Sequence, residues 1–493
     1  MKSLEAEVHK SLKEFLKQCR KPFGESHLTM ARLISHILCL QRSAIIQTNS
    51  SISYYGLSYL FPSLLFNRPI LLVAPLSIQH NFKRREIPYL RQWLKQHNII
   101  FNETCEKRLN NFHGLLIVSP HIWLHSYFKE QKYLLSNTLT LIDRADHLEK
   151  WTRNYLTVTI TPRSWKNLED NYLYFSTLIY KVKSFLKYSI SNYSDNPYQQ
   201  YLLGLEEKKS LLTLCKSIPQ DSFLNLVEEK ILDDNYFLWA SISRQKRTFL
   251  IHLSPLDLFS TLSPLLHSFN TIFIGEILDY NKSALIYRKN VGIREKLLCL
   301  KLSQNQLSKI VNLYIYDRLP MPNTSRFQET LILHIKKIVH GSYSQLKPIL
   351  IIIDDIPLKK KVAVSLTSEF GSKIKIEKIK IENNYILISS WKFWKNNQDK
   401  LPPPKLLIIA TLPFPSLENP LVSSKVNYYK KQYKDWFYSY LLPTALQEMQ
   451  RSLISLRASK GTITLLDNRI NYRSYGKRFL AALQPYVKIS YIK

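Results

Sequence analysis

The stretch RSAIIQTNSSISYYGLSYLFPSLLFNRPILLVAP, residues 42–75, decides the fold of the first half of the chain. It predicts an apolar strand over Ala44–Gln47, a small-polar loop over Thr48–Gly56 and, after a helix, a buried strand over Ile70–Ala74. Proteins that bind phosphate through a loop use the same order of strand, loop, helix and strand. The loop nevertheless contains a single glycine, Gly56, and the whole stretch contains no lysine.

The bulk composition predicts a globular protein of two to four domains, because 493 residues that are 45% apolar can bury a large core. The net charge is +32, from 69 Lys and Arg against 37 Asp and Glu. A charge of this size favours a polyanionic partner, most simply nucleic acid. The alternative is codon drift, since the chain is also rich in Ile, Asn, Tyr and Lys.

Several classes of protein are disfavoured by the same reading. No run of 18 apolar residues exists, and the charged N-terminal stretch lacks the apolar core of a signal peptide. We therefore expect a cytoplasmic protein without a membrane partner. The five cysteines form no C-x-x-C pair, so neither a zinc site nor an iron–sulfur cluster is expected.

Two further apolar runs, Gly114–Ser119 and Thr138–Asp143, extend the pattern of buried parallel strands separated by helices. After these runs the apolar residues recur at helical spacing, and strand-like runs resume at Arg247–Leu253. From Asn312 onward, a second set of strands and helices follows. The predicted fold is α/β, with a first domain over residues 1–160, a helical insertion over 161–245, a return to the first domain over 246–290 and a second domain over 291–493.

Segments spread over most of the chain carry a resemblance to a known family. LTLIDRADHLEKW stands where an acidic box would lie, and ILIIIDDIPLKKKVAVSLTSEFG would open a second domain. LLIIATLPFPSLENPLVSSKV and GTITLLDNRINYRSYGKRFLAAL are the most specific. Together they resemble the DinG/XPD-type superfamily 2 DNA helicases over most of the chain. The resemblance implies two RecA-like domains of the P-loop NTPase type, each with a parallel sheet.

The phosphate loop of this family has the form G-x-x-x-x-G-K-[ST], in which backbone amides, a lysine and a hydroxyl bind phosphate and Mg²⁺. Here Thr48, Ser50, Ser51 and Gly56 occupy the loop, and Tyr54 and Tyr55 fall at or beside the Gly-Lys position. We expect these positions to be a degenerate remnant of the cofactor-binding loop.

The acidic box retains its first acid, Asp143, but Arg144 replaces the glutamate that polarises water. An arginine stays protonated and cannot act as a general base. The coupling segment reads Gly275-Glu276-Ile277-Leu278 and lacks hydroxyls. In the last motif, Q-x-x-G-R-x-x-R, Gln450 and Arg457 fit the outer positions, and Ile454 replaces the inner arginine. Arg457 is expected either to bind an anion or to pair with Asp467, and Asp143, Gln450 and Arg457 are expected to be vestigial catalytic positions.

Basic and aromatic side chains at strand ends are candidates for nucleic-acid contact, because bases stack on aromatic rings and phosphates attract cations. One aromatic–basic cluster lies at Ser389–Lys400; its tryptophans could equally be core packing at a seam between domains. The predicted contacts are Lys83, Arg84, Arg85, Trp391, Lys392, Trp394 and Arg473.

Our first interpretation is a helicase-like protein that binds nucleic acid, with DNA favoured over RNA, and that has lost ATP hydrolysis, so that no cofactor is expected. A second is a working ATP- and Mg²⁺-dependent helicase in which Arg42 or Arg68 replaces the loop lysine. A third is a non-catalytic scaffold for a protein partner.

Overall fold

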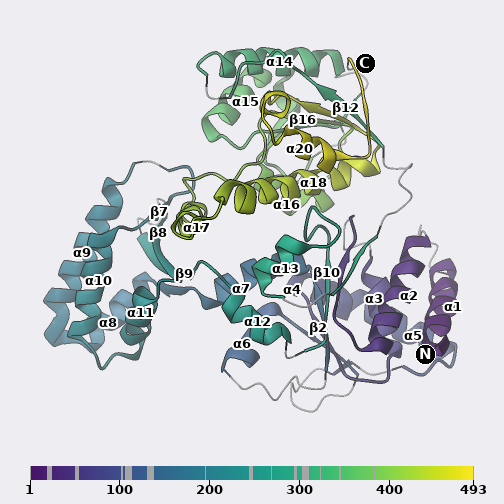
Figure 1. The fold of residues 1–493 in the computed structure, drawn as a ribbon, viewed down its shortest axis with the longest axis horizontal. Coiled ribbons are helices and arrows are strands. Elements are labelled where there is room, and N and C mark those ends of the chain that lie inside the picture. The colour runs from purple at the N-terminus through teal and green to yellow at the C-terminus, as the bar shows by residue number, and fades with distance from the viewer. Residues whose placement is uncertain are drawn as a thin grey trace.

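The computed structural model describes most of the chain as two α/β domains and an insertion that projects from the first (Figure 1). Among the described residues, no helix is long and apolar enough to cross a membrane. The described residues are 2–18, 25–49, 55–101, 104–105, 114–129, 138–194, 196–243, 248–267, 269–293, 297–302, 310–322, 324–342, 346–381 and 384–491.

The first domain is built on a parallel seven-stranded sheet whose strands are short and almost wholly apolar. Such strands are typical of a sheet that is covered on both faces. In spatial order the strands are β11 (Leu298–Lys301), β1 (Ala44–Gln47), β10 (Thr271–Gly275), β5 (Leu139–Asp143), β2 (Ile70–Val73), β4 (Leu115–Val118) and β3 (Thr104–Cys105).

Helices cover both faces of this sheet, and the alternation of side chains along β1 shows it directly. Ala44 and Ile46 pack with one group of helices, whereas Ile45 packs with the other. On the first face lie α1 (Lys2–Gln18), α2 (Glu25–Leu40), α3 (Gly56–Leu65) and α5 (Ile87–Gln96). On the second lie α6 (Pro120–Lys129), α7 (Leu148–Leu156), α12 (Phe259–His267) and α13 (Leu285–Val291).

The second domain repeats this plan with another parallel seven-stranded sheet. Its order is β14 (Ile374–Ile376), β15 (Ile386–Ser389), β13 (Ile349–Ile352), β16 (Leu406–Ile409), β17 (Thr462–Leu465), β12 (Val311–Ile315) and β18 (Tyr486–Lys488). One face carries α14 (Phe327–Ser342) and α15 (Ile356–Phe370); the other carries α16 (Trp391–Asn397), α18 (Leu442–Ala458) and α20 (Gly476–Leu483). Helix α17 (Pro420–Lys431) packs beside the last group. The predicted pair of parallel-sheet domains is confirmed.

The insertion differs from its prediction, because it contains a four-stranded antiparallel sheet besides its helices. The segment Arg247–Leu253 was expected to return to the first sheet, but its described residues, 248–253, supply most of an insertion strand. The strands are β6 (Val158–Ile160), β9 (Thr248–Pro255), β8 (Tyr236–Ser243) and β7 (Gln200–Leu202), and the helices are α8 (Pro162–Asn171), α9 (Ser176–Asn192), α10 (Leu205–Ser217) and α11 (Ser222–Leu232).

The domain boundaries shift accordingly. The insertion runs from β6 to β9, about Val158 to Pro255, rather than over residues 161–245. Strand β11 pairs with β1, so the first domain extends to about Lys301 rather than ending at 290. Strands β6 and β11 are short strands at sheet edges, where the apolar signal is weak, whereas β9 is a longer inner strand of the antiparallel sheet.

Candidate functional site between the two domains

The phosphate-loop position follows β1, and its first amides are already used within the protein. The N–H of Thr48 donates to the Gly275 carbonyl at 2.9 Å, and the N–H of Asn49 donates to the Glu276 carbonyl at 3.0 Å. Thr48 is fully buried. These bonds tie the start of the loop to the segment after β10. Ser50 and Ser51, which were predicted to belong to this loop, lie outside the described residues.

Helix α3 begins at the position where the family would place its lysine. Tyr55 is fully buried there, and its ring lies 5.0 Å from the ring of His27. A Cβ added to Gly56 would lie 3.0 Å from Cε1 of Phe82, so this glycine makes room for a packed aromatic ring. The start of the helix therefore packs in the hydrophobic core. Neither Tyr55 nor Gly56 provides a positive charge that could bind a phosphate.

Asp143 ends β5 and is almost completely buried, with 1% of its surface exposed. Burial raises the pKa of this carboxyl to about 6, although Arg144 and a hydrogen bond from Tyr59 act in the opposite direction. Its Oδ1 atom has no hydrogen-bond partner among the described residues. The first acid of the box is thus retained, but in a setting that disfavours its charge.

Asp146, three residues after Asp143, forms an ion pair with an arginine from the second domain. A guanidinium nitrogen of Arg451, on α18, lies 3.4 Å from Oδ2 of Asp146, and Arg451 also donates to the Ile277 carbonyl at 2.9 Å. Burial would raise the pKa of Asp146, but Arg451 and other nearby cations outweigh burial and lower it. The second domain therefore closes directly onto the acidic-box position.

Arg144 makes a second ionic contact across the boundary, at 3.9 Å from Asp399. A magnesium ion beside Asp143 would thus share its surroundings with two guanidinium groups, those of Arg144 and Arg451. Within the described ranges, no group of three or more His, Cys, Asp or Glu side chains could hold a metal ion. The positive charge beside Asp143 disfavours a magnesium ion at this position.

The residues predicted for the last motif, Gln450 and Arg457, do not face the acidic box. Gln450 donates to the Ala482 carbonyl at 3.4 Å. The guanidinium of Arg457 donates to the carbonyls of Leu483, Gln484 and Pro485 at the end of α20. The alternative pairing of Arg457 with Asp467 is wrong, since Asp467 pairs with Arg469.

The residues that face the box lie three positions earlier on the same helix. Gln447 donates to the Leu278 carbonyl at 3.0 Å, beside the contact of Arg451 with Ile277. The pattern Q-x-x-G-R-x-x-R, begun at Gln447, places Arg451 at its inner arginine and Ile454 at its outer one. This alternative register was the signal that could have identified Arg451, and it replaces the prediction that the inner arginine is missing.

The coupling segment after β10 is therefore joined to the second domain through backbone carbonyls instead of hydroxyls. A further contact links Lys425 on α17 to Glu149 on α7, which also binds Arg153 at 3.0 Å. Burial would raise the pKa of Glu149, but Lys425 and Arg153 outweigh it and lower the pKa to about 2. These contacts bind the two domains along one face of α18 and α17 (Figure 1).

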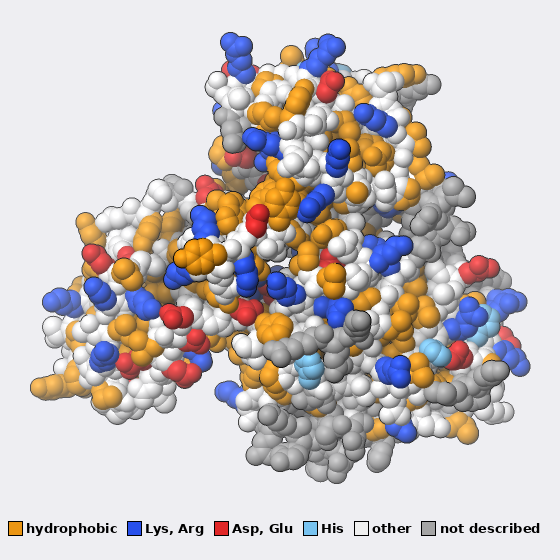
Figure 2. Space-filling view, viewed as in Figure 1, with side chains coloured by type: hydrophobic (Ala, Val, Ile, Leu, Met, Phe, Trp, Pro, Cys, Tyr) orange, Lys and Arg blue, Asp and Glu red, His pale blue; other side chains and the backbone are white. Residues whose placement is uncertain are grey.

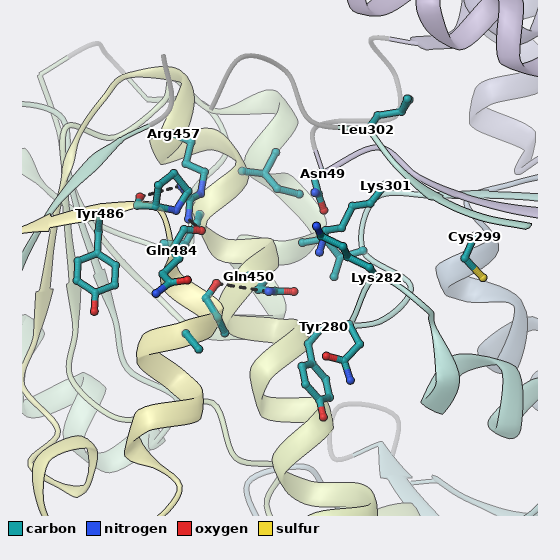
Figure 3. A pocket seen from close by; sticks show the side chains of 17 residues that line it. Asn49, Tyr280, Lys282, Cys299, Lys301, Leu302, Gln450, Arg457, Gln484 and Tyr486 are labelled. Carbon is teal, nitrogen blue, oxygen red and sulfur yellow. Dashed lines mark hydrogen bonds between the residues drawn. The ribbon is translucent and has the colours of Figure 1, made fainter. Parts of the chain in front are cut away.

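A pocket of about 920 Å³ lies next to these contacts, between the two domains (Figure 3). The first domain contributes Asn49, the loop after β10 and the end of β11, and the second contributes α18 and the segment after α20. Basic side chains line it from both domains, namely Lys282, Lys301 and Arg457.

The predicted nucleic-acid contacts divide into exposed and buried residues. Lys83, Arg84 and Arg85 are exposed on a short π-helix, Phe82–Glu86, and Lys392 and Arg473 are exposed on the second domain. Trp391 and Trp394 are 5% and 1% exposed.

The two tryptophans pack in the core between α16 and α18, and the indole nitrogen of Trp394 donates to the Ser452 carbonyl. The prediction that they stack on bases is wrong, and their alternative role as core residues is confirmed.

Exposed aromatic and basic side chains gather instead at the end of α17 and near the start of α20. Tyr433 is fully exposed, Lys430 lies 5.6 Å from the ring centre of Trp436, and Arg478 lies 4.8 Å from that of Tyr438. The Tyr438 hydroxyl hydrogen bonds Ser474 at 3.2 Å, which joins the two segments. We call this the aromatic–basic surface: Lys430, Tyr433, Trp436, Tyr438, Arg473 and Arg478. Figure 2 shows hydrophobic and basic side chains side by side around α17 and the start of α18.

Two parallel-sheet domains with an acidic box, a cross-domain arginine and an insertion in the first domain define the class of superfamily 2 helicase-like proteins. The helicase C-terminal domain family matches residues 338–486. A solved XPD helicase structure aligns with 95% of this chain and 100% of its own, at 12% identity and a TM-score of 0.59. This likeness shows the shared fold.

The sequence is also similar to those of two characterised bacterial proteins. The chain is 22% identical to the ATP-dependent DNA helicase YoaA of Escherichia coli over 272 residues, which cover 52% of this chain and 42% of YoaA. It is 34% identical to the 3'-5' exonuclease DinG of Bacillus subtilis over 117 residues, which cover 23% of this chain and 13% of DinG. The chain thus spans less than half the length of these relatives. In sequence and in fold the chain is similar to the DinG/XPD-type superfamily 2 helicases, and its residues 338–486 match the helicase C-terminal domain family.

Proposed function

We propose that this protein binds single-stranded nucleic acid, with DNA as the favoured ligand, and does not couple binding to ATP hydrolysis. The similarity to a DNA helicase supports the ligand class. The net charge of +32 supports a polyanionic partner.

The aromatic–basic surface is the observation that carries the binding proposal. Tyr433 and Tyr438 are exposed, and Lys430, Arg473 and Arg478 stand beside them, whereas the only acid in the segment from Lys430 to Tyr440 is Asp435. Aromatic rings stack on bases of any sequence, and the cations contact the phosphates, which together suit a single strand.

The loss of hydrolysis is supported by the charges at the acidic box. Arg144 stands at the glutamate position and cannot accept a proton from water. Arg451 is engaged with Asp146 and the Ile277 carbonyl. The N–H groups of Thr48 and Asn49 are bound to β10 and the residue after it. The expected absence of an iron–sulfur cluster and the cytoplasmic location stay predictions.

Binding to a fluorescently labelled oligo-dT, followed by anisotropy at several salt concentrations, tests the proposal. We expect the variant Lys430→Gln/Arg478→Gln to bind at least about tenfold more weakly and to show a salt slope reduced by about 1.4, since each single-strand phosphate contact contributes ~0.7. The variant Arg163→Gln/Lys166→Gln removes two exposed cations from the insertion and is the matched control. Equal affinity of both variants, or no binding by the wild type at low salt, would reject the proposal.

A working ATP-dependent helicase is the second candidate, and two observations favour it. Arg451 occupies the inner arginine position of the last motif, and Oδ1 of Asp143 has no partner among the described residues. The decisive measurement is phosphate release from ATP with and without single-stranded DNA. Turnover that depends on DNA and disappears in Asp143→Asn would establish this candidate in place of the first.

A further inference from the structure

The sheet of the second domain has an open edge at β14. This strand, Ile374–Ile376, is the last in the strand order, and among the described strands it pairs with β15 alone. Just beyond it, the N–H of Glu377 donates to the Ile388 carbonyl at 3.1 Å. Because backbone groups alternate in direction along a strand, the N–H groups of Ile374 and Ile376 point away from β15. The edge therefore presents backbone groups with which another strand could pair.

The sequence at this edge alternates between lysine and isoleucine. It reads KIKIEKIKI over residues 373–381. Ile376 and Ile379 are 47% and 44% exposed, and Lys378 and Lys380 are exposed beside them. Such alternation is typical of a strand with one apolar and one polar face, and here it continues beyond the 3 residues that pair with β15. The segment therefore has the pattern of a longer strand than the one it forms.

The acid within this stretch, Glu377, is already bound by other parts of the second domain. Its Oε1 atom accepts from Lys359 at 2.7 Å and from the backbone N–H and the hydroxyl of Ser390 at 3.0 and 2.7 Å. Burial would raise the pKa of Glu377, but Lys359 and Ser390 outweigh burial and lower it. Neither Lys378 nor Lys380 forms an ion pair with a described residue. These lysines are therefore available to acids from outside the chain.

We propose that β14 binds an extended, acidic segment of a partner protein as an added strand. The apolar side chains of that segment cover Ile376 and Ile379, and its acids face Lys375 and Lys378. Lysines on an open edge also prevent pairing with the edges of other proteins, so they select an acidic segment over a neutral one. Isoleucine offers no aromatic ring for a base to stack on, which disfavours nucleic acid as the ligand of this edge.

Fluorescence anisotropy of the full chain with a short labelled peptide, in which glutamate alternates with valine, tests this edge. We expect saturable binding. A peptide of the same composition, with all its glutamates before its valines, should bind at least about tenfold more weakly, because its acids cannot share one face of a strand. Two edge variants should weaken binding of the alternating peptide by at least about tenfold. Lys375→Glu/Lys378→Glu places like charges opposite the peptide, and Ile376→Pro removes an outward N–H. Circular dichroism verifies that both variants are folded.

The matched control is Arg163→Glu/Lys166→Glu, which makes the same change of charge on exposed residues of the insertion and should bind the peptide as the wild type does. Equal affinities for the two peptides would mean that charge alone attracts them, and would overturn the proposal. An unchanged affinity in either edge variant, no binding by the wild type at low salt, or displacement of the peptide by oligo-dT would overturn it as well. Lys430→Gln/Arg478→Gln should retain peptide binding, so the outcome is independent of the nucleic-acid proposal.

Discussion

Asp143 shows how a retained motif residue can have a changed physical role. Its carboxyl is buried beside Tyr59 and Arg144, and burial raises its pKa to about 6 from a model-peptide value near 4. The native state therefore binds a proton more tightly than the unfolded chain does. Ionised Asp143 costs stability above pH 6, and this cost disappears as the pH falls toward 4.

We predict that Asp143→Asn increases the free energy of unfolding at pH 7. A rise of about two pKa units corresponds to a cost of up to about 3 kcal/mol, which the neutral amide avoids. At pH 4 the gain should largely vanish, because the wild-type carboxyl is then protonated in the native state. Urea denaturation midpoints at the two pH values measure the difference; a variant that is less stable than the wild type at pH 7 would contradict it.

For single residues, the sequence showed which motif positions are retained or replaced. It did not show which way their side chains face. The substitution of Arg144 for glutamate was legible in the sequence. The roles of Trp391 and Trp394 were not, because burial depends on how α18 packs across α16, which no local pattern encodes. Arg451 and Arg457 lie six residues apart on one helix, and only the fold shows which of them faces the first domain.

The parallel strands were the elements that the sequence predicted best. Runs such as Ile349–Ile352 are apolar on both faces, because helices cover both sides of each sheet. The strands that were missed are edge or antiparallel strands. Tyr486–Lys488 and Leu298–Lys301 are short and partly exposed, so they carry little of the apolar signal.

The close approach at the start of α20 yields a prediction about one element. A Cβ at Gly476 would lie 1.9 Å from the Ile470 carbonyl oxygen, so α20 would have to move. We expect Gly476→Ala to lower the free energy of unfolding by about 2 kcal/mol or more. Gly341→Ala is the control, since a Cβ there meets nothing within 4 Å. Because alanine has a higher helix propensity than glycine, Gly341→Ala should raise the free energy of unfolding by up to about 1 kcal/mol.

Urea unfolding of the two glycine variants, followed by far-ultraviolet circular dichroism, gives the comparison. A Gly476→Ala variant as stable as the wild type would show that α20 can shift at little cost.

The whole molecule depends on a small set of charges between its two domains. Asp146 and Arg451 are both nearly buried, with side-chain exposures of 4% and 9%. Burying two charges costs desolvation free energy, and their attraction offsets this only while both are present. The pair therefore specifies the relative position of the domains more than it adds stability.

We predict that Arg451→Gln lowers the free energy of unfolding by about 3 kcal/mol, because Asp146 then loses its main partner inside the interface. The double variant Asp146→Asn/Arg451→Gln should recover part of this loss. Small-angle X-ray scattering is expected to show a larger radius of gyration for the single variant than for the double. Equal values for the two variants would mean that the ion pair does not hold the domains together.

The chain leaves and rejoins the first domain at adjacent points, since β6 pairs with β9 and Arg153 donates to the carbonyls of Pro255, the last residue of β9, and Leu256, the residue after it. The insertion is thus a cassette whose two ends meet at a single joint. It could be gained, lost or exchanged in evolution as one piece, because the order of the parallel strands would be the same without it.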